Sequence, residues 1–106
     1  MRLANKTAII TGGGSGIGKA SAKFFHREGA NVVLFGRRKH KLEETVQELG
    51  SRALAIEGDM CQSTDLDRLV QETQSTFKRI DILVNNAGIF KGAPLHRFLM
   101  TSMMKL

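Results

Sequence analysis

Two patterns of apolar residues alternate along this chain. Short, mostly apolar runs, several of them rich in β-branched residues, occur at residues 7–11, 31–35, 53–56 and 80–84. Such runs are typical of parallel strands that are buried on both faces. Between them, apolar residues recur every three or four positions, which predicts helices. The chain therefore predicts the order β-α-β-α-β-α-β, with helix ends near Gly29, Gly50 and Lys78.

Each predicted helix has an apolar face that should pack against the sheet. The expected inward residues are Ile17, Ala20, Phe24 and Phe25 in the first helix, Leu42, Val46 and Leu49 in the second, and Leu66, Leu69, Val70 and Phe77 in the third. At the start of the third helix, Ser63 or Thr64 is a candidate N-cap, and Thr64 with Asp67 matches a capping box.

Strands that alternate with helices through short connections require a parallel sheet with right-handed crossovers and helices on both faces. The predicted fold class is α/β, a Rossmann-type doubly wound sheet with strand order 3-2-1-4. In such a sheet the ligand crevice lies at the carboxyl ends of the strands, where the strand order reverses. We therefore expect chemistry after the first and fourth strands.

The turn after the first strand is rich in glycine. Five glycines occur within seven positions, namely Gly12, Gly13, Gly14, Gly16 and Gly18. Glycine allows a sharp turn and a close approach of the backbone to a ligand. The helix that opens at about residues 15–18 directs free N–H groups and its positive dipole end toward that place. The stretch therefore predicts an anion site, with phosphate as the expected occupant.

Two common phosphate loops do not fit this spacing. The dinucleotide fingerprint G-x-G-x-x-G begins at Gly14 and Gly16, but Lys19 stands at the last glycine position. The nucleotide triphosphatase loop G-x-x-x-x-G-K-[ST] fits from Gly13 to Lys19, but Ala20 stands where a magnesium-binding hydroxyl is needed.

A third pattern, T-G-x-x-x-G-x-G, does fit, with Thr11 and Gly12 followed by Gly16 and Gly18. It resembles the cofactor loop of the short-chain dehydrogenase/reductase family. The resemblance implies cofactor contacts from Thr11, Gly12, Gly14, Ser15, Gly16, Ile17 and Gly18. The alternative interpretation is a flexible turn without a ligand.

The end of the second strand bears on the choice of cofactor. Domains that bind NAD place an Asp or Glu about 20 residues after the first glycine to hold the ribose hydroxyls. This strand instead ends in Gly36 and is followed by Arg37 and Arg38. A guanidinium can bind a ribose phosphate through two hydrogen bonds. NADP(H) is therefore expected in preference to NAD(H), as in the family members that carry a basic residue here.

Two further segments resemble the family. Asp59 and Met60 follow the third strand, where the family has an acid and a hydrophobic residue against the adenine ring; a surface turn is the alternative. After the fourth strand, Asn85-Asn86-Ala87-Gly88 matches the family's second signature. The resemblance implies that these asparagines hold the central sheet and line the cofactor crevice.

The resemblance covers about residues 1–95 and implies an oxidoreductase that interconverts an alcohol and a carbonyl. The family's catalytic Ser and Tyr-x-x-x-Lys lie beyond this stretch, and the 106 residues contain no tyrosine. We assign no catalytic residue. Three interpretations stay open: the dinucleotide-binding half of such an enzyme, an inactive NADP(H)-binding module, or a non-functional truncated product.

The composition of the chain helps to distinguish between possible kinds of binding partner. The net charge of +6 could suit nucleic acid, but apart from residues 37–41 the basic residues are dispersed, so a phosphate-bearing cofactor is favoured. One cysteine and histidines without ligand spacing predict no internal disulfide, no metal and a cytoplasmic setting. No membrane segment is expected. The family's members are homo-oligomers, and an exposed edge at the fourth strand would favour self-association or aggregation.

Residues 96–106 form a separate, aberrant tail in this interpretation. The family has an acidic helix start here, whereas this chain has basic residues and three methionines between Arg97 and Leu106. Read from the third base of the preceding codon, Met100-Thr101 and Met103-Met104 must each encode Asp, and Met104-Lys105 must encode Glu. The hypothesis is a frameshifted reading of a longer gene; a genuine variable C-terminus, with Leu99 and Met103 on one helix face, is the alternative.

Overall fold

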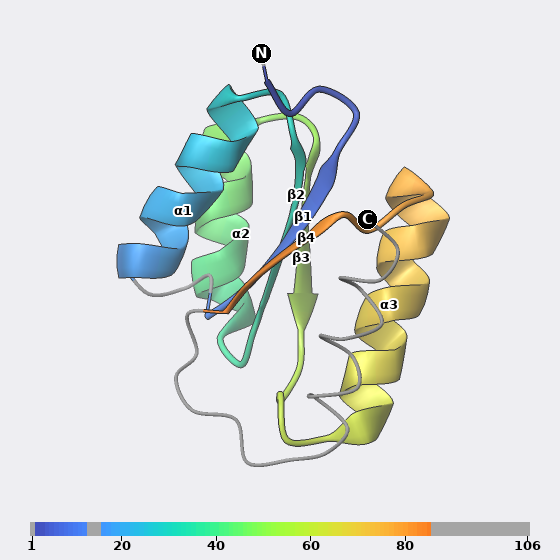
Figure 1. Ribbon diagram of the computed structural model, residues 1–106. Coiled ribbons are helices and arrows are strands. Elements are labelled where there is room, and N and C mark those ends of the chain that lie inside the picture. The colour runs from blue at the N-terminus through green and yellow to red at the C-terminus, as the bar shows by residue number, and fades with distance from the viewer. Residues whose placement is uncertain (1, 13–15, 86–106) are drawn as a thin grey trace.

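The computed structural model describes residues 2–12 and 16–85, and the expected tail lies outside them. Four strands and three helices alternate along these residues (Figure 1). They are β1 (Thr7–Thr11), α1 (Gly16–Arg27), β2 (Asn31–Gly36), α2 (Lys39–Leu49), β3 (Ala53–Glu57), α3 (Ser63–Phe77) and β4 (Ile82–Asn85). The strands form one parallel sheet in the order β3-β2-β1-β4, which confirms the predicted α/β class and strand order.

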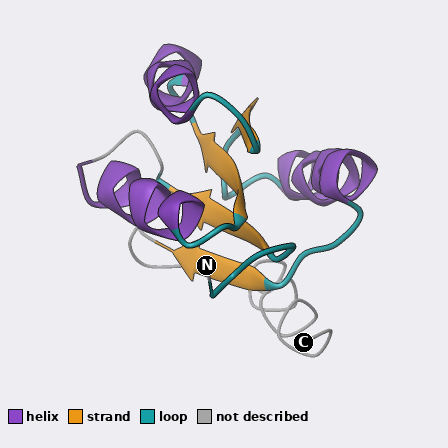
Figure 2. Cartoon of the chain, turned by 90° about the horizontal axis from the view of Figure 1, so that it is seen from above, coloured by secondary structure: helices purple, strands orange, loops and turns teal. Residues whose placement is uncertain are grey.

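The sheet separates two apolar clusters, as the layers in Figure 2 show. One lies under α1 and α2, the other under α3. On the first side the buried residues are Ile10, Ala22, Val32, Leu34 and Leu42. On the second side they are Ile9, Val33, Phe35, Ile56, Leu66, Leu69 and Ile80. Neighbouring residues of β1 and β2 thus point to opposite layers, as the period of two in a strand requires.

β1 is the central strand and is buried along its whole length. It pairs in parallel with β2 from Thr7↔Asn31 to Thr11↔Phe35, and with β4 from Ala8↔Ile82 to Thr11↔Asn85. Within the described part of the chain, β4 pairs with β1 alone, so that β3 and β4 are the sheet edges there.

Asp81, the residue directly before β4, is a buried carboxylate. Asp81 is 5% exposed, and its Oδ2 accepts hydrogen bonds from the Thr7 N–H at 2.9 Å and from Arg79 Nε at 2.7 Å. Arg79 Nη2 donates to Oδ1 at 2.7 Å. Burial alone would raise the pKa of Asp81, but the bonds from Arg79 and Thr7 and the charges of Arg79 and Lys6 outweigh it. The pKa therefore lies below its ordinary value.

The inward face of α1 differs from the expected one. Ile17 is 71% exposed, Phe24 is 48% exposed, and Ala20 is also exposed. Gly18 and Ala22 are buried instead, and the half-buried Phe25 packs on the same cluster. These three residues have the spacing i, i+4, i+7 of one helix face. The large apolar residues Ile17 and Phe24 predicted that their own face of α1 is buried. The buried face instead carries the small residues Gly18 and Ala22, which allow α1 to lie close to the sheet.

The ends of the helices agree with the sequence only in part. Gly50 follows α2 with φ 85°, and its N–H donates to the Val46 carbonyl at 2.9 Å, as expected of a glycine cap. The N-cap of α3 is Gln62, without a side-chain cap bond, so the predicted capping box of Thr64 and Asp67 is wrong. Ile80 is buried but precedes β4, which begins at Ile82.

The Asp81 contacts predict acid-sensitive stability. Because its pKa is lower in the folded chain, the stabilisation is complete above the unfolded-state value near ~4 and is lost as pH falls through the folded value. We expect Asp81→Asn to lower the free energy of unfolding at pH 7 by about 1–3 kcal/mol, because the amide carries no charge and has one acceptor oxygen in place of two, so that a donor held by Asp81 loses its acceptor.

Urea unfolding of this chain between pH 7 and about pH 2 measures both effects. Asp81→Asn should also flatten the loss of stability at acidic pH. Glu43→Gln, a change at an exposed acid of α2, is the matched control and should leave both quantities nearly unchanged. A wild-type pH profile in Asp81→Asn would contradict the assignment.

Candidate functional site

The strand register brings the predicted site residues to one edge of the sheet. Thr11 lies level with Phe35 of β2 and with Asn85 of β4, and Gly36 lies level with Glu57 of β3. The carboxyl ends of all four strands therefore lie at one edge of the sheet. This is the edge at which doubly wound sheets bind ligands.

A side-chain hydrogen bond joins β1 and β4 at this edge. The Thr11 hydroxyl donates to Asn85 Oδ1 at 2.8 Å and lies 3.4 Å from the Val84 carbonyl oxygen. Asn85 thus links the central strand to β4 by its side chain as well as by the ladder. The other predicted residues of its signature, Asn86, Ala87 and Gly88, lie outside the described residues.

The glycine-rich turn leaves β1 in a conformation that disfavours other residues. Gly12 has φ 68°, and its N–H donates to the Phe35 carbonyl at 2.9 Å. Gly16 begins α1, and a Cβ there would meet no atom within 4 Å. Gly18 is buried and Ile17 is exposed, while Gly14 and Ser15 lie outside the described residues. The start of α1 carries no acidic residue in its first turn, so nothing there repels an anion.

Lys19 is directed toward α2 rather than toward the turn. Its Nζ lies 3.0 Å from Glu48 Oε1, and Lys23 Nζ lies 3.3 Å from Glu48 Oε2. The hydrogen bonds from Lys19 and Lys23 lower the pKa of Glu48. A triphosphatase loop needs its lysine at the phosphates, so this ion pair agrees with the mismatch at Ala20.

Arg37 and Arg38 directly follow β2, and both are exposed. Arg38 is the N-cap residue of α2. Within the described part of the chain, neither guanidinium forms an ion pair with a carboxylate. Both can therefore contact an external anion without first breaking an ion pair to a carboxylate of the described residues.

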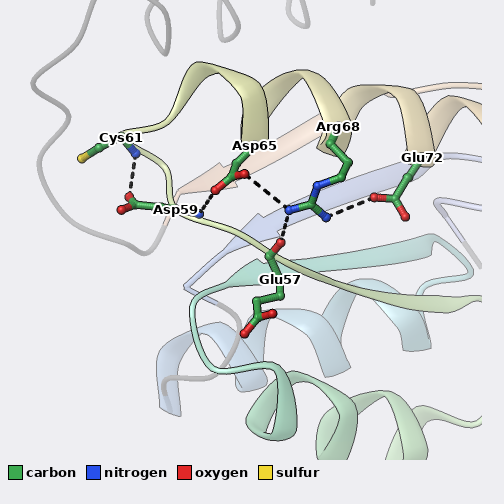
Figure 3. A network of polar contacts seen from close by, with 6 residues as sticks. All are labelled: Glu57, Asp59, Cys61, Asp65, Arg68 and Glu72. Atoms are coloured by element: carbon green, nitrogen blue, oxygen red, sulfur yellow. Dashed lines mark hydrogen bonds and ion pairs between the residues drawn. The ribbon is translucent and has the colours of Figure 1, made fainter.

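Asp59 and Met60 lie in the loop between β3 and α3, and Figure 3 shows the polar network around Asp59. The Asp59 N–H donates to Asp65 Oδ2 at 2.8 Å, and Asp59 Oδ1 accepts from the Cys61 N–H at 2.8 Å. The half-buried Met60 packs against the core cluster under α3. Asp59 is therefore held both by its backbone and by its carboxylate.

Arg68 holds the same loop from the next turn of α3. Its Nη2 donates to the Glu57 carbonyl and lies 3.6 Å from Asp65 Oδ1, while Nη1 lies 3.3 Å from Glu72 Oε2. Sequence reasoning missed Asp65 and Arg68. Their spacing on the helix was visible, but nothing in the chain order showed that they reach back to the end of β3.

Gly58 was missed as well. A Cβ at Gly58 would lie 2.5 Å from Phe35 Cε1, 2.6 Å from Phe35 Cζ and 3.1 Å from Asp65 Cβ. The Gly58 N–H donates to the Gly36 carbonyl at 2.8 Å. The buried Phe35 ring thus occupies the space that a side chain would need. A single glycine after a predicted strand is only a weak signal for this contact.

Other kinds of site find no support along residues 2–12 and 16–85. No three His, Cys, Asp or Glu side chains gather there as a metal site would require. No helix in those ranges is both long and apolar enough to cross a bilayer.

Comparison with known proteins identifies the class. The family model for short chain dehydrogenases matches residues 6–106. The chain therefore belongs to the short-chain dehydrogenase/reductase family, as its glycine turn and strand ends predicted.

Among relatives, the chain is 45% identical over 94 residues to oxidoreductase asL5 of Sarocladium schorii, with 89% of this chain and 38% of the relative covered. It is 39% identical over 99 residues to the short-chain dehydrogenase/reductase homolog YusS of Bacillus subtilis, with 90% and 91% covered. The chain thus spans well under half of the first relative and most of the second.

Two solved structures have the same fold. A short chain dehydrogenase from Bacillus anthracis matches with a TM-score of 0.77 and 42% identity, over 81% of this chain and 36% of the other. Glucose dehydrogenase of Caenorhabditis elegans in its apo form matches with a TM-score of 0.79 and 36% identity, over 95% and 44%.

The packing at Gly58 leads to a stability prediction. We expect Gly58→Ala to lower the free energy of unfolding by about 1–3 kcal/mol, because the added methyl group overlaps the fixed Phe35 ring. Gly36→Ala is the matched control at the neighbouring strand end, where a Cβ would lie 3.5 Å from Leu42 Cδ2 in ordinary contact. Urea unfolding measures both variants, and equal losses would contradict the steric argument.

Proposed function

We propose that this chain forms the dinucleotide-binding part of an NADP(H)-dependent oxidoreductase that interconverts alcohols and carbonyls. The observation that carries the proposal is the meeting of two features at one sheet edge. The glycine turn after Thr11 and the Arg37-Arg38 pair after β2 lie on adjacent strands whose ends are level. A dinucleotide presents its pyrophosphate and its ribose phosphate across such a pair of strand ends.

The turn fits a pyrophosphate. The left-handed Gly12 turns the chain out of β1, and α1 begins at Gly16 with no acid in its first turn. Helix N-termini of this kind favour bound phosphate through N–H donors and the dipole. In the proposal Gly14, Ser15 and Ile17 complete the turn, and Gly18 lets the helix lie against the sheet.

The end of β2 fits a 2′-phosphate rather than free ribose hydroxyls. Gly36 offers no carboxylate, and the exposed Arg37 and Arg38 have no internal ion pair among the described residues. A charge-assisted bidentate contact to phosphate is stronger than a neutral hydrogen bond. NADP(H) is therefore the proposed cofactor.

The remaining contacts lie on either side of these groups. Asp59 and Met60 would lie against the adenine ring, while Asn85 and, beyond the described residues, Asn86, Ala87 and Gly88 would line the nicotinamide side of the crevice. When bound, the nicotinamide supplies a hydride. These 106 residues contain no tyrosine to act as the family's proton donor, so the proposed role of residues 1–95 is binding and orientation.

A second candidate is a module that binds NADP(H) without catalysis of its own. It is favoured by the identity to Bacillus subtilis YusS, 91% of which this chain spans. Turnover separates the two candidates: NADPH-dependent reduction of a carbonyl supports the first, and binding without turnover, both by this chain and by any longer product of the same locus, supports the second. A cytoplasmic location and self-association along the β4 edge belong to the proposal in either case.

The cofactor preference is directly measurable. We expect this chain to bind NADPH about ten- to a hundredfold more tightly than NADH, the equivalent of a charge-assisted contact worth about 1.5–3 kcal/mol. Arg37→Asp should abolish or reverse that preference, because it places a negative charge beside the 2′-phosphate. Calorimetric titration with each dinucleotide gives both affinities.

Arg27→Asp is the charge-matched control, since Arg27 lies in the last turn of α1 at the opposite end of the helix from the glycine turn. It should leave the ratio of NADPH to NADH affinities unchanged. Equal affinities for the two dinucleotides in the unmodified chain would refute the NADP(H) assignment.

A further inference from the structure

We infer that Asp65 and Arg68 of α3 are positioning residues that set adenine recognition by Asp59. The inference rests on the proposed function, in which Asp59 contacts the adenine ring of the dinucleotide. It concerns two residues that lie beyond the loop itself, one and two turns along the next helix (Figure 3).

Asp65 fixes the backbone of the loop. Its Oδ2 accepts the Asp59 N–H at 2.8 Å, and its side chain is 29% exposed. The Asp59 carboxylate is oriented at the same time, because its Oδ1 accepts the Cys61 N–H at 2.8 Å. With the peptide N–H and one carboxylate oxygen both held, the direction of the Asp59 side chain follows from the position of Asp65.

Arg68 fixes the strand end from which the loop leaves. Its Nη2 donates to the Glu57 carbonyl, and its contacts with Asp65 and Glu72 keep the guanidinium in place. Ion pairs on exposed surface contribute little by themselves. Two hydrogen bonds of this network should therefore affect binding of the dinucleotide. They are the bond from Arg68 to the Glu57 carbonyl and the bond from the Asp59 N–H to Asp65.

The loop is held on its other side by β2. The Gly58 N–H donates to the Gly36 carbonyl at 2.8 Å, and the buried Phe35 ring fills the space beside the Gly58 Cα. The loop is thus held between α3 and β2, the strand that ends at Gly36 immediately before Arg37. Loss of the contacts from α3 should release Asp59, while β2 stays in the sheet and Arg37 and Arg38 stay at its end.

A held carboxylate can distinguish adenine from hypoxanthine. Adenine carries an amino group that donates a hydrogen bond to a carboxylate, whereas hypoxanthine carries a carbonyl oxygen at that position, which a carboxylate repels. If Asp59 is held toward the base, the protein should prefer the adenine dinucleotide. If Asp59 is free to turn away, most of this preference should disappear.

The experiment compares binding of NADPH and of its hypoxanthine analogue, deamino-NADPH, to the 106-residue chain by calorimetric titration. We expect a preference for NADPH of about tenfold or more, as for a hydrogen bond to a charged group. Asp65→Ala should reduce the preference to within about threefold. Asp65→Asn keeps an acceptor oxygen and should therefore retain the preference for NADPH. Asp67→Ala, at an exposed acid of the same helix, is the matched control and should also retain this preference.

The outcomes separate the inference from the proposed function. If the unmodified chain binds neither dinucleotide, the proposed function fails. If it binds both equally, dinucleotide binding stands but the positioning inference is overturned. If Asp65→Ala weakens both ligands by the same factor, Asp65 has only a structural role and the inference is again overturned.

A second variant covers the case in which Asp65→Ala does not fold. Arg68→Met keeps the aliphatic stem, and the side chain that it replaces is 45% exposed, so the fold should tolerate it. It removes the donor to the Glu57 carbonyl and should lower the preference for NADPH over deamino-NADPH at least about threefold, by the loss of one hydrogen bond. A preference equal to that of the unmodified chain would overturn the inference.

Discussion

The structure depends on the attachment of β4 to both ends of the buried strand β1. At the start of β1, the Thr7 N–H donates to Asp81, and at its end the Thr11 hydroxyl donates to Asn85. In strands that are mostly apolar on both faces, a shift of one residue exchanges one apolar face for the other, so the apolar pattern alone does little to fix the register. Polar contacts at each end favour one alignment, since a shift of one residue would separate the buried Asp81 carboxylate from the Thr7 N–H and the Thr11 hydroxyl from Asn85.

That alignment also assembles the site. Because Thr11, Phe35 and Asn85 lie level, the glycine turn, the arginine pair and the asparagine all emerge at one edge. The loop after β3 joins the same edge through the bond from Gly58 to Gly36. In the proposed function each strand thus contributes one part of the dinucleotide site, and no part would bind the whole molecule by itself.

The sequence was sufficient to predict features that depend on neighbouring residues along the chain. Mostly apolar runs predicted the strands, and the spacing of glycines from Gly12 to Gly18 predicted the turn and, through resemblance, the family. The strand order followed because a chain of strands and helices with short connections has few parallel arrangements. The roles of the individual site residues stay predictions.

Features that depend on distant contacts could not be predicted in this way. The inward face of α1 is set by how closely Gly18 and Ala22 approach the sheet, whereas the pattern gave weight to the larger Ile17 and Phe24. Asp81 looked like part of a strand and is a buried ion-pair partner. Gly58 and Asp65 acquire their roles only when Phe35 and the end of β3 lie beside them.

The bond between Thr11 and Asn85 has a consequence for the order of folding, because 74 residues separate its partners in the chain. The pairs that join β1 to β2, such as Thr7 and Asn31, are 24 residues apart. Closing a longer loop costs more chain entropy, and contacts between distant segments slow folding. β1, β2 and β3 should therefore associate before β4 does, and amide hydrogen exchange should show earlier protection in β2 than in β4. During synthesis, the side of the crevice proposed to bind phosphate would therefore form before β4 closes the side proposed to bind nicotinamide.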